Sequence, residues 1–223
     1  MMIIWSLFDG SGIMVKPWAD AGHKCYCFNY DGANHGSYEP IRVKHENIEY
    51  IDCWIDDSFL SNRQVDACPN PDVIFAFPDC TEMAVSGAKH KHTGINSILV
   101  AEMVQSFAEF VGATWMVENP VGKMSTLWRR PDHYFHPFEY GGYMTGAEET
   151  FHPRMPPRDA YTKKTCLWVG NGFVMPEKKP VPHIGKFWGW AYLGGKSAKT
   201  KQLRSLTPRG FARAVFEANN KAP

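Results

Sequence analysis

Two side chains that could do covalent chemistry each follow an apolar run of the sequence. Cys80 comes after the run 72–77 and a proline, and Glu118 directly follows the run 114–117. If both runs are buried parallel strands, their carboxyl ends meet at one edge of a sheet, where α/β proteins bind ligands. A thiol there can act as a nucleophile once its proton is removed or its pKa is lowered. We therefore expect Cys80 and Glu118 to share one site.

A thiol beside a carboxyl group is suited to the ring of a cytosine. The carboxyl group can protonate N3 and accept a hydrogen bond from the exocyclic amine, which makes C6 electrophilic. Addition of the thiolate at C6 then turns C5 into a carbon nucleophile that can take a methyl group from a sulfonium. Taken singly, Cys80 could be a packed loop thiol and Glu118 one half of a salt bridge.

A glycine-rich turn, Phe8-Asp9-Gly10-Ser11-Gly12, ends the first apolar run. Glycines let a backbone approach a ligand, and the start of a following helix favours an anionic group such as a cofactor carboxylate. Asp31 closes the next apolar run, where an acidic residue can hold ribose hydroxyls. Together they predict a nucleoside-containing cofactor, although a tight structural turn alone would explain the glycines equally well.

Strands and helices are predicted to alternate in the first half of the chain, which is typical of an α/β protein with a mainly parallel sheet. The predicted strands are 3–8, 24–29, 43–48, 72–77, 114–117 and 164–169. The predicted helices are 14–21, 96–111 and 207–219, the last with Thr207 as N-cap and Pro208 at its first position.

The predicted organisation is one catalytic core with a small lobe. Residues 1–170 form the core, in which 121–160 is an irregular, substrate-facing segment rich in glycine, proline and aromatic residues. Residues 171–203 form a small lobe or linker, and 204–223 carry a C-terminal helix that packs back on the core.

Composition excludes some classes of protein. The chain has 223 residues and a net charge of +1, and no run of 18 apolar residues that would span a membrane. Six scattered cysteines in a chain of this size indicate reduced thiols and a cytoplasmic location. The histidine pairs His90/His92 and His133/His136 have no cysteine or carboxylate at a spacing that would complete a metal site, so no metal is expected. The basic stretch 196–213 is predicted to contact DNA phosphates.

Five segments resemble motifs of the DNA cytosine-5 methyltransferases, in the same order and at workable spacing. The sequence as a whole is most similar to short phage-encoded members of this family, of the kind found with restriction-modification systems. The five segments are the glycine-rich turn, Pro78-Asp79-Cys80-Thr81, Glu118-Asn119-Pro120, Tyr161-Thr162-Lys163-Lys164-Thr165 and Arg204-Ser205-Leu206-Thr207-Pro208-Arg209.

The resemblance implies a Rossmann-like methyltransferase sheet with a small irregular lobe rich in proline and aromatic residues, S-adenosyl-L-methionine as cofactor, and methyl transfer to C5 of cytosine in DNA. The catalytic residues that it implies are Cys80, Glu118 and Lys163. The cofactor-binding residues are Phe8, Asp9, Gly10, Gly12, Asp31, Asn47 and Pro78. The substrate-binding residues are Asn119, Pro120, Thr165, Ser86 and Arg204.

The chain also departs from this family. Asp79 stands where a second proline is usual, Lys163 and Thr165 replace two arginines, and Asn47 replaces an aspartate. The chain is also too short for a full target-recognition domain, so short or relaxed sequence specificity is expected. Two alternatives stay open. The same fold could act on a free cytosine nucleotide or transfer a different group, or the protein could be an inactive DNA-binding decoy.

Overall fold

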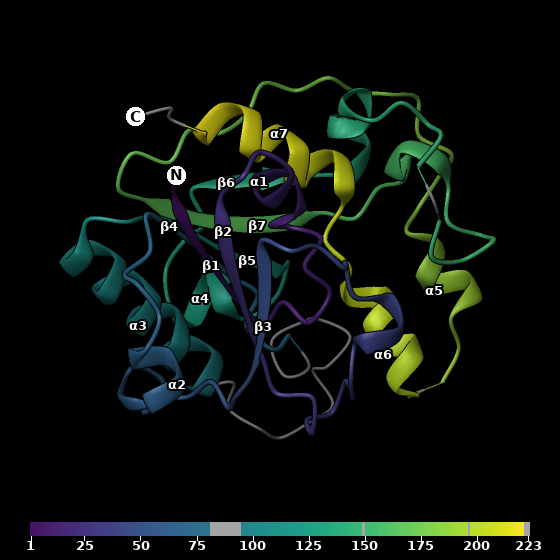
Figure 1. The fold of residues 1–223 in the computed structure, drawn as a ribbon. Coiled ribbons are helices and arrows are strands. Elements are labelled where there is room, and N and C mark those ends of the chain that lie inside the picture. The colour runs from purple at the N-terminus through teal and green to yellow at the C-terminus, as the bar shows by residue number, and fades with distance from the viewer. Residues whose placement is uncertain (81–94, 149, 196, 221–223) are drawn as a thin grey trace.

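A seven-stranded mixed sheet forms the centre of the computed structural model, which describes residues 1–80, 95–148, 150–195 and 197–220. The strand order is β3-β2-β1-β4-β5-β7-β6 (Figure 1). Neighbours among β1 to β5 are parallel, as predicted, whereas β7 is antiparallel to both β5 and β6. The strands are β1 (Ile3–Leu7), β2 (Lys24–Asn29), β3 (Ile48–Asp52), β4 (Val73–Ala76), β5 (Thr114–Pro120), β6 (His133–Phe135) and β7 (Thr165–Gly170).

Helices cover both faces of this sheet. In Figure 1, α1 and α7 lie over one face, and α2, α3 and α4 lie over the other. The α-helices are α1 (Lys16–Asp20), α2 (Arg63–Asp66), α3 (Ile95–Val111), α4 (Met124–Leu127), α5 (Trp188–Tyr192), α6 (Ala198–Ser205) and α7 (Arg209–Asn219). The 3-10 segments are η1 (Glu39–Ile41), η2 (Phe59–Ser61), η4 (Pro137–Tyr143) and η5 (Pro157–Asp159).

The alternation of side chains along each strand produces two hydrophobic cores. On β1, Trp5 and Leu7 join the core beneath α3, whereas Ile4 joins the core beneath α1 and α7. Strands that are buried on both faces consist of nearly continuous apolar residues, which is why these strands can be recognised in the sequence. A third cluster joins α5 and α6 to the Ile13 side of the turn after β1, so the predicted small lobe packs on the core.

The strand order fixes where a ligand can bind. From β1 the chain passes to β2 on one side, and β4 pairs with β1 on the other. The order therefore reverses between β1 and β4, and open α/β sheets bind ligands at the carboxyl ends of the strands beside such a reversal. The glycine-rich turn follows β1, and Cys80 follows β4.

Three details of the predicted elements were wrong. The third strand lies at Ile48–Asp52 instead of 43–48, and the segment 121–160 contains β6 and η4. Thr207 is not the N-cap of α7. Pro208 occupies that position, and the carboxylate of Asp159, 50 residues away, accepts the first free backbone N–H, from Arg209. Among the described residues no helix is both long and apolar enough to cross a membrane.

Candidate active site

The turn after β1 is organised by the carboxylate of Asp9. Asp9 is 4% exposed and accepts hydrogen bonds from the backbone N–H groups of Ser11 (3.1 Å) and Gly12 (2.7 Å). The hydroxyls of Ser11 and Ser6 also donate to it. Burial raises the pKa of Asp9, and these four hydrogen bonds oppose that effect. The turn therefore satisfies its own N–H groups, and Asp9 acts on its backbone rather than facing outward to a ligand.

Close packing explains the glycines of this turn. A Cβ at Gly10 would collide with the ring of Tyr38, and one at Gly12 with the hydroxyl of Tyr50. Gly12 has a φ of 72°, and Phe8, with a φ of 59°, also adopts the left-handed region. That conformation is strained for a non-glycine residue, and such strain is concentrated at functional sites.

The predicted ribose ligand Asp31 lies at the carboxyl end of β2 in a network with Arg42. One guanidinium nitrogen of Arg42 lies 3.1 and 3.2 Å from the two carboxylate oxygens of Asp31. Arg42 Nε also donates to the carbonyl of Gly10 at 3.0 Å, and the guanidinium stacks over the ring of Tyr50. Arg42 thus holds the glycine-rich turn against the end of β2, and the sequence pattern gave no sign of this role.

Asn47 does not lie with the other predicted cofactor residues. It precedes β3, at the amino end of the parallel strands, and its amide donates to the carbonyl of Ala19 at the end of α1. The residue at the carboxyl end of β3 is Asp52, which accepts a hydrogen bond from the backbone N–H of Asp31 at 2.8 Å. Correct placement of β3 would have identified it.

Two exposed aromatic side chains flank this pair of carboxylates. Tyr30 directly follows β2, Trp54 lies two residues after the end of β3, and their rings meet edge to face at 5.1 Å. Both are large apolar side chains left substantially exposed, at 42% and 56%. An exposed aromatic pair beside two carboxylates offers a surface for a flat base next to acceptors for sugar hydroxyls.

Cys80 lies just past the carboxyl end of β4 and is partly exposed. Burial raises the pKa of its thiol to about 11. The positive charge of Lys163 lowers this pKa, and the negative charges of Asp79 and Glu118 raise it. The charges of Glu118 and Lys163 therefore both act on the Cys80 thiol, and these two residues line one cavity.

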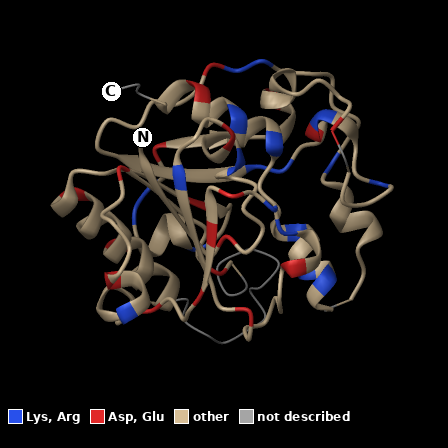
Figure 2. Ribbon diagram, in the orientation of Figure 1, with Lys and Arg blue, Asp and Glu red and all other residues tan. Residues whose placement is uncertain are grey.

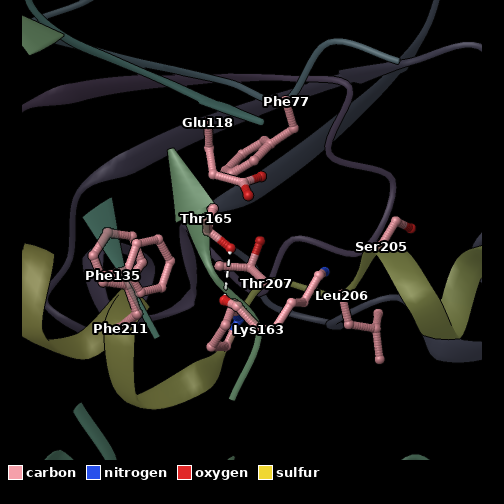
Figure 3. A pocket seen from close by; sticks show the side chains of 10 residues that line it. Phe77, Glu118, Phe135, Lys163, Thr165, Ser205, Leu206, Thr207 and Phe211 are labelled. Carbon is pink, nitrogen blue, oxygen red and sulfur yellow. Dashed lines mark hydrogen bonds between the residues drawn. The ribbon is translucent and has the colours of Figure 1, made fainter. Parts of the chain in front are cut away.

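Glu118 lines a small cavity between β5, β7 and the start of α7. Its volume is about 20 Å³, enough for about one water molecule. Figure 3 shows the side chains of Glu118, Thr165 and Thr207 converging on this cavity. Burial raises the pKa of Glu118, while the nearby ammonium group of Lys163 lowers it. A carboxyl group with a raised pKa can hold a proton and donate it.

Lys163 and Thr165 enter the cavity from the start of β7. The ammonium group of Lys163 donates to the backbone carbonyl of Arg204 at 3.0 Å and lies 5.1 Å from the ring centroid of Phe187. Thr165 is 2% exposed, and its hydroxyl donates to the carbonyl of Lys163 (Figure 3). Antiparallel pairing sets Pro120 opposite Thr165, so β5 and β7 deliver these side chains to one place.

Asn119 ties the nucleophile turn to β5. Its amide nitrogen donates to the carbonyl of Pro78 at 2.9 Å, and the side chain is 1% exposed. Its amide oxygen has no hydrogen-bond partner among the described residues. Pro78 and Asn119 therefore fix the position of Cys80 relative to Glu118, and neither shows a direct role toward a ligand.

The remaining predicted substrate residues lie elsewhere. The guanidinium of Arg204 donates to the carbonyls of Leu193 (2.5 Å) and Gly189 (3.3 Å), so it supports α5 and does not line the cavity. Ser86 lies outside the described residues.

The basic stretch 196–213 is used in part inside the fold. Lys201 donates to the backbone and side-chain oxygens of Asn34. Arg209 pairs with Asp159, which is fully buried, at 2.9 Å. Of the remaining cations in the described part of this stretch, Lys199 and Arg213 are exposed, and Arg213 pairs with Glu217 at 3.3 Å. The stretch therefore offers fewer free charges to DNA than its composition suggests.

These features define a mixed α/β protein with a thiol, a carboxyl group and an ammonium group at the carboxyl edge of its sheet. No family model matches the chain, and no curated protein matches it. Among solved structures, it is similar to an E. coli protein provisionally described as a DNA modification methyltransferase encoded within a prophage. That match has a TM-score of 0.42 at 15% identity and covers 82% of this chain and 53% of the other. The chain thus spans about half the length of that protein.

Proposed function

We propose that this protein transfers a methyl group from S-adenosylmethionine to C5 of cytosine in DNA through a covalent bond between Cys80 and C6. The observation that carries the proposal is that Glu118 and Lys163 line one cavity at the carboxyl edge of the sheet and that both charges act on the thiol of Cys80, just past the end of β4. A protonated Glu118 would donate to N3 of the base and make C6 electrophilic. The positive charge of Lys163 would stabilise the thiolate of Cys80 during attack.

The protons must move in a defined order. The Cys80 thiol, with a pKa near 11, must lose its proton before it adds to C6. After C5 has taken the methyl group, water takes the C5 proton, the electron pair of that C–H bond forms the C5–C6 double bond, and the thiolate leaves C6 with the C–S electron pair while N3 returns its proton to Glu118. Lys163 keeps a positive charge close to the sulfur in both the first and the last step.

The residues at the ends of β2 and β3 fit a nucleoside cofactor. Asp31 and Asp52 supply carboxylates for ribose hydroxyls, and Tyr30 and Trp54 offer exposed ring surface for the adenine. S-adenosylmethionine would supply an electrophilic methyl group on a sulfonium. Because Asp9 already occupies the N–H groups of the turn, we expect the turn to shape this site by packing rather than by binding the cofactor carboxylate.

The experiment that tests this proposal uses DNA containing 5-fluorocytosine. Fluorine at C5 cannot leave as a proton does, so methyl transfer strands the enzyme on its substrate. We expect a denaturant-stable adduct that needs S-adenosylmethionine and maps to Cys80 by mass spectrometry. Cys80→Ser should abolish it, and Cys68→Ser, at another partly exposed thiol, should not.

The same assay separates the alternatives. Single-stranded DNA, duplex DNA and dCMP are supplied in parallel with labelled cofactor. Methylation without an adduct would refute C5 chemistry, and an adduct on another cysteine would refute the site. Transfer to dCMP alone would identify a nucleotide enzyme. Binding of DNA without any transfer would identify an inactive DNA-binding protein.

A further inference from the structure

A second concave surface lies beside the candidate active site. It is a groove of about 660 Å³ lined by residues from the segments 153–157 and 184–192. This volume is in the range of pockets that hold small organic ligands. Phe187 lines the groove and also contacts the ammonium group of Lys163, at 5.1 Å. The groove and the candidate active site therefore share a wall.

Four of the twelve described residues that line this groove are aromatic. Trp190 is 61% exposed and Tyr192 is 55% exposed, although large rings are normally buried. Trp188 also lines the groove and is buried. Its indole N–H has no hydrogen-bond partner among the described residues. A buried donor without a partner costs free energy unless a ligand or water satisfies it. The groove thus offers the exposed flat faces of Trp190 and Tyr192, whereas the indole N–H of Trp188 is buried behind its wall.

The charge of the groove favours an anion. Arg154 and Lys186 line it and are exposed, and neither forms an ion pair with another described residue. No acidic side chain is among the described residues of the lining, and the sequence has none between Glu177 and Glu217. In Figure 2 the helix α6, which belongs to this acid-free stretch, carries lysine and arginine only among its charged residues. The guanidinium of Arg154 lies 5.1 Å from the ring centroid of Tyr192, so cation and aromatic face act together.

We propose that this groove binds an unpaired nucleotide of a DNA strand, with its base stacked on Trp190 and its phosphates beside Arg154 and Lys186. Exposed aromatic faces combined with free cations are the features by which proteins hold single-stranded nucleic acid. Bases inside a duplex are stacked on one another and cannot offer their faces to a ring. The proposal rests on the proposed function only in taking DNA as the substrate, and it assigns the strand flanking the reacting cytosine to the groove.

Binding of fluorescently labelled hexanucleotides tests this assignment without any need for activity. The probes are an oligothymidylate, an oligomer of abasic sites with the same phosphates, and a duplex of the same length. We expect the oligothymidylate to bind and to quench tryptophan emission. Trp190→Ala should weaken that binding by about five- to 150-fold, the range for loss of one stacked base. Trp190→Phe should retain most of the affinity.

The controls separate stacking from charge. Phe110→Ala removes an aromatic ring that is 88% exposed on α3 and does not line the groove, so oligothymidylate affinity should not change. The abasic oligomer should bind equally to the protein and to Trp190→Ala. Neutralising Arg154 and Lys186 together should lower the salt slope by about 1.4, the value for two single-strand phosphates.

Three results would overturn the proposal. The first is that Trp190→Ala and Phe110→Ala change oligothymidylate affinity equally, and the second is that the duplex binds with the same dependence on Trp190. The third is a concentration-dependent dimer that Trp190→Ala abolishes, which would assign the groove to a second copy of the chain. An adduct formed by Trp190→Ala at saturating 5-fluorocytosine DNA would leave the proposed function intact. If the oligothymidylate binds in the groove but no adduct forms with 5-fluorocytosine DNA, the proposal for the groove stands and the proposed methyl transfer is refuted.

Discussion

The ionisation of Cys80 is the feature of the candidate site that can be measured most directly. Its thiol has a pKa of about 11, against 9.0 for an unperturbed cysteine. At pH 8 the thiolate fraction is therefore about 0.1%, roughly 100-fold below that of an unperturbed thiol. Because Lys163 lowers this pKa, Lys163→Gln should slow the alkylation of Cys80 in the unliganded protein further. The expected decrease is about tenfold, the effect of raising the pKa by one.

Alkylation by iodoacetamide, followed on the Cys80 peptide by mass spectrometry, measures this. Between pH 7 and pH 10 the logarithm of the rate should rise by about one per pH unit without reaching a plateau. Lys164→Gln is the matched control, because Lys164 is the exposed neighbour and does not line the cavity. A plateau below pH 9 would refute the raised pKa, and equal rates in the two lysine variants would refute the influence of Lys163.

Three further expectations follow from other contacts. Glu118→Gln should slow adduct formation by about 100-fold and leave calorimetric affinity for S-adenosylmethionine unchanged, because the amide cannot donate the N3 proton; a normal rate would remove Glu118 from catalysis. Asp31→Ala should weaken cofactor binding by about 1–3 kcal/mol in the same calorimetry, and unchanged affinity would exclude the ribose role. Burial raises the pKa of Cys25 to about 12 and the pKa values of Cys53 and Cys166 to about 11, so these thiols stabilise the fold below pH 9 and lose that contribution as the pH rises toward 11. Urea unfolding at pH 10 should therefore give a lower free energy than at pH 8, by about 1 kcal/mol for each thiol, and a flat pH profile would contradict this.

The parallel half of the sheet was predictable because its strands are buried on both faces. Apolar runs in the sequence mark β1, β2, β4 and β5, and Cys80 and Glu118 are found at the carboxyl ends of β4 and β5. The edge strand β3 was misplaced because one of its five residues is fully buried, so its apolar signal is weak. That error carried Asn47 to the wrong end of the sheet.

Contacts between distant segments could not be read from local patterns. The antiparallel insertion of β7 between β5 and β6 depends on pairing across more than 40 residues. Asp159 caps α7 from 50 residues away, and Arg42 reaches Asp31 and Gly10 from a segment that was predicted to form no helix or strand. The count of basic residues likewise assigned Arg209 to DNA contact, whereas this arginine pairs with the buried Asp159 inside the fold.

Arg204 forms a second link between the candidate active site and the groove, in addition to the contact of Phe187 with Lys163. Its backbone carbonyl accepts the hydrogen bond of Lys163, and its guanidinium holds the carbonyls of Gly189 and Leu193 at the end of α5, which forms one wall of the groove. Any ligand that moves α5 therefore changes the free energy of the Lys163 ammonium position. By thermodynamic linkage, the reverse effect has the same size. In a double-mutant cycle, the effects of substituting Trp190 and Lys163 on the free energy of oligothymidylate binding should then be non-additive. Substitution of Arg204 should bring these effects closer to additivity.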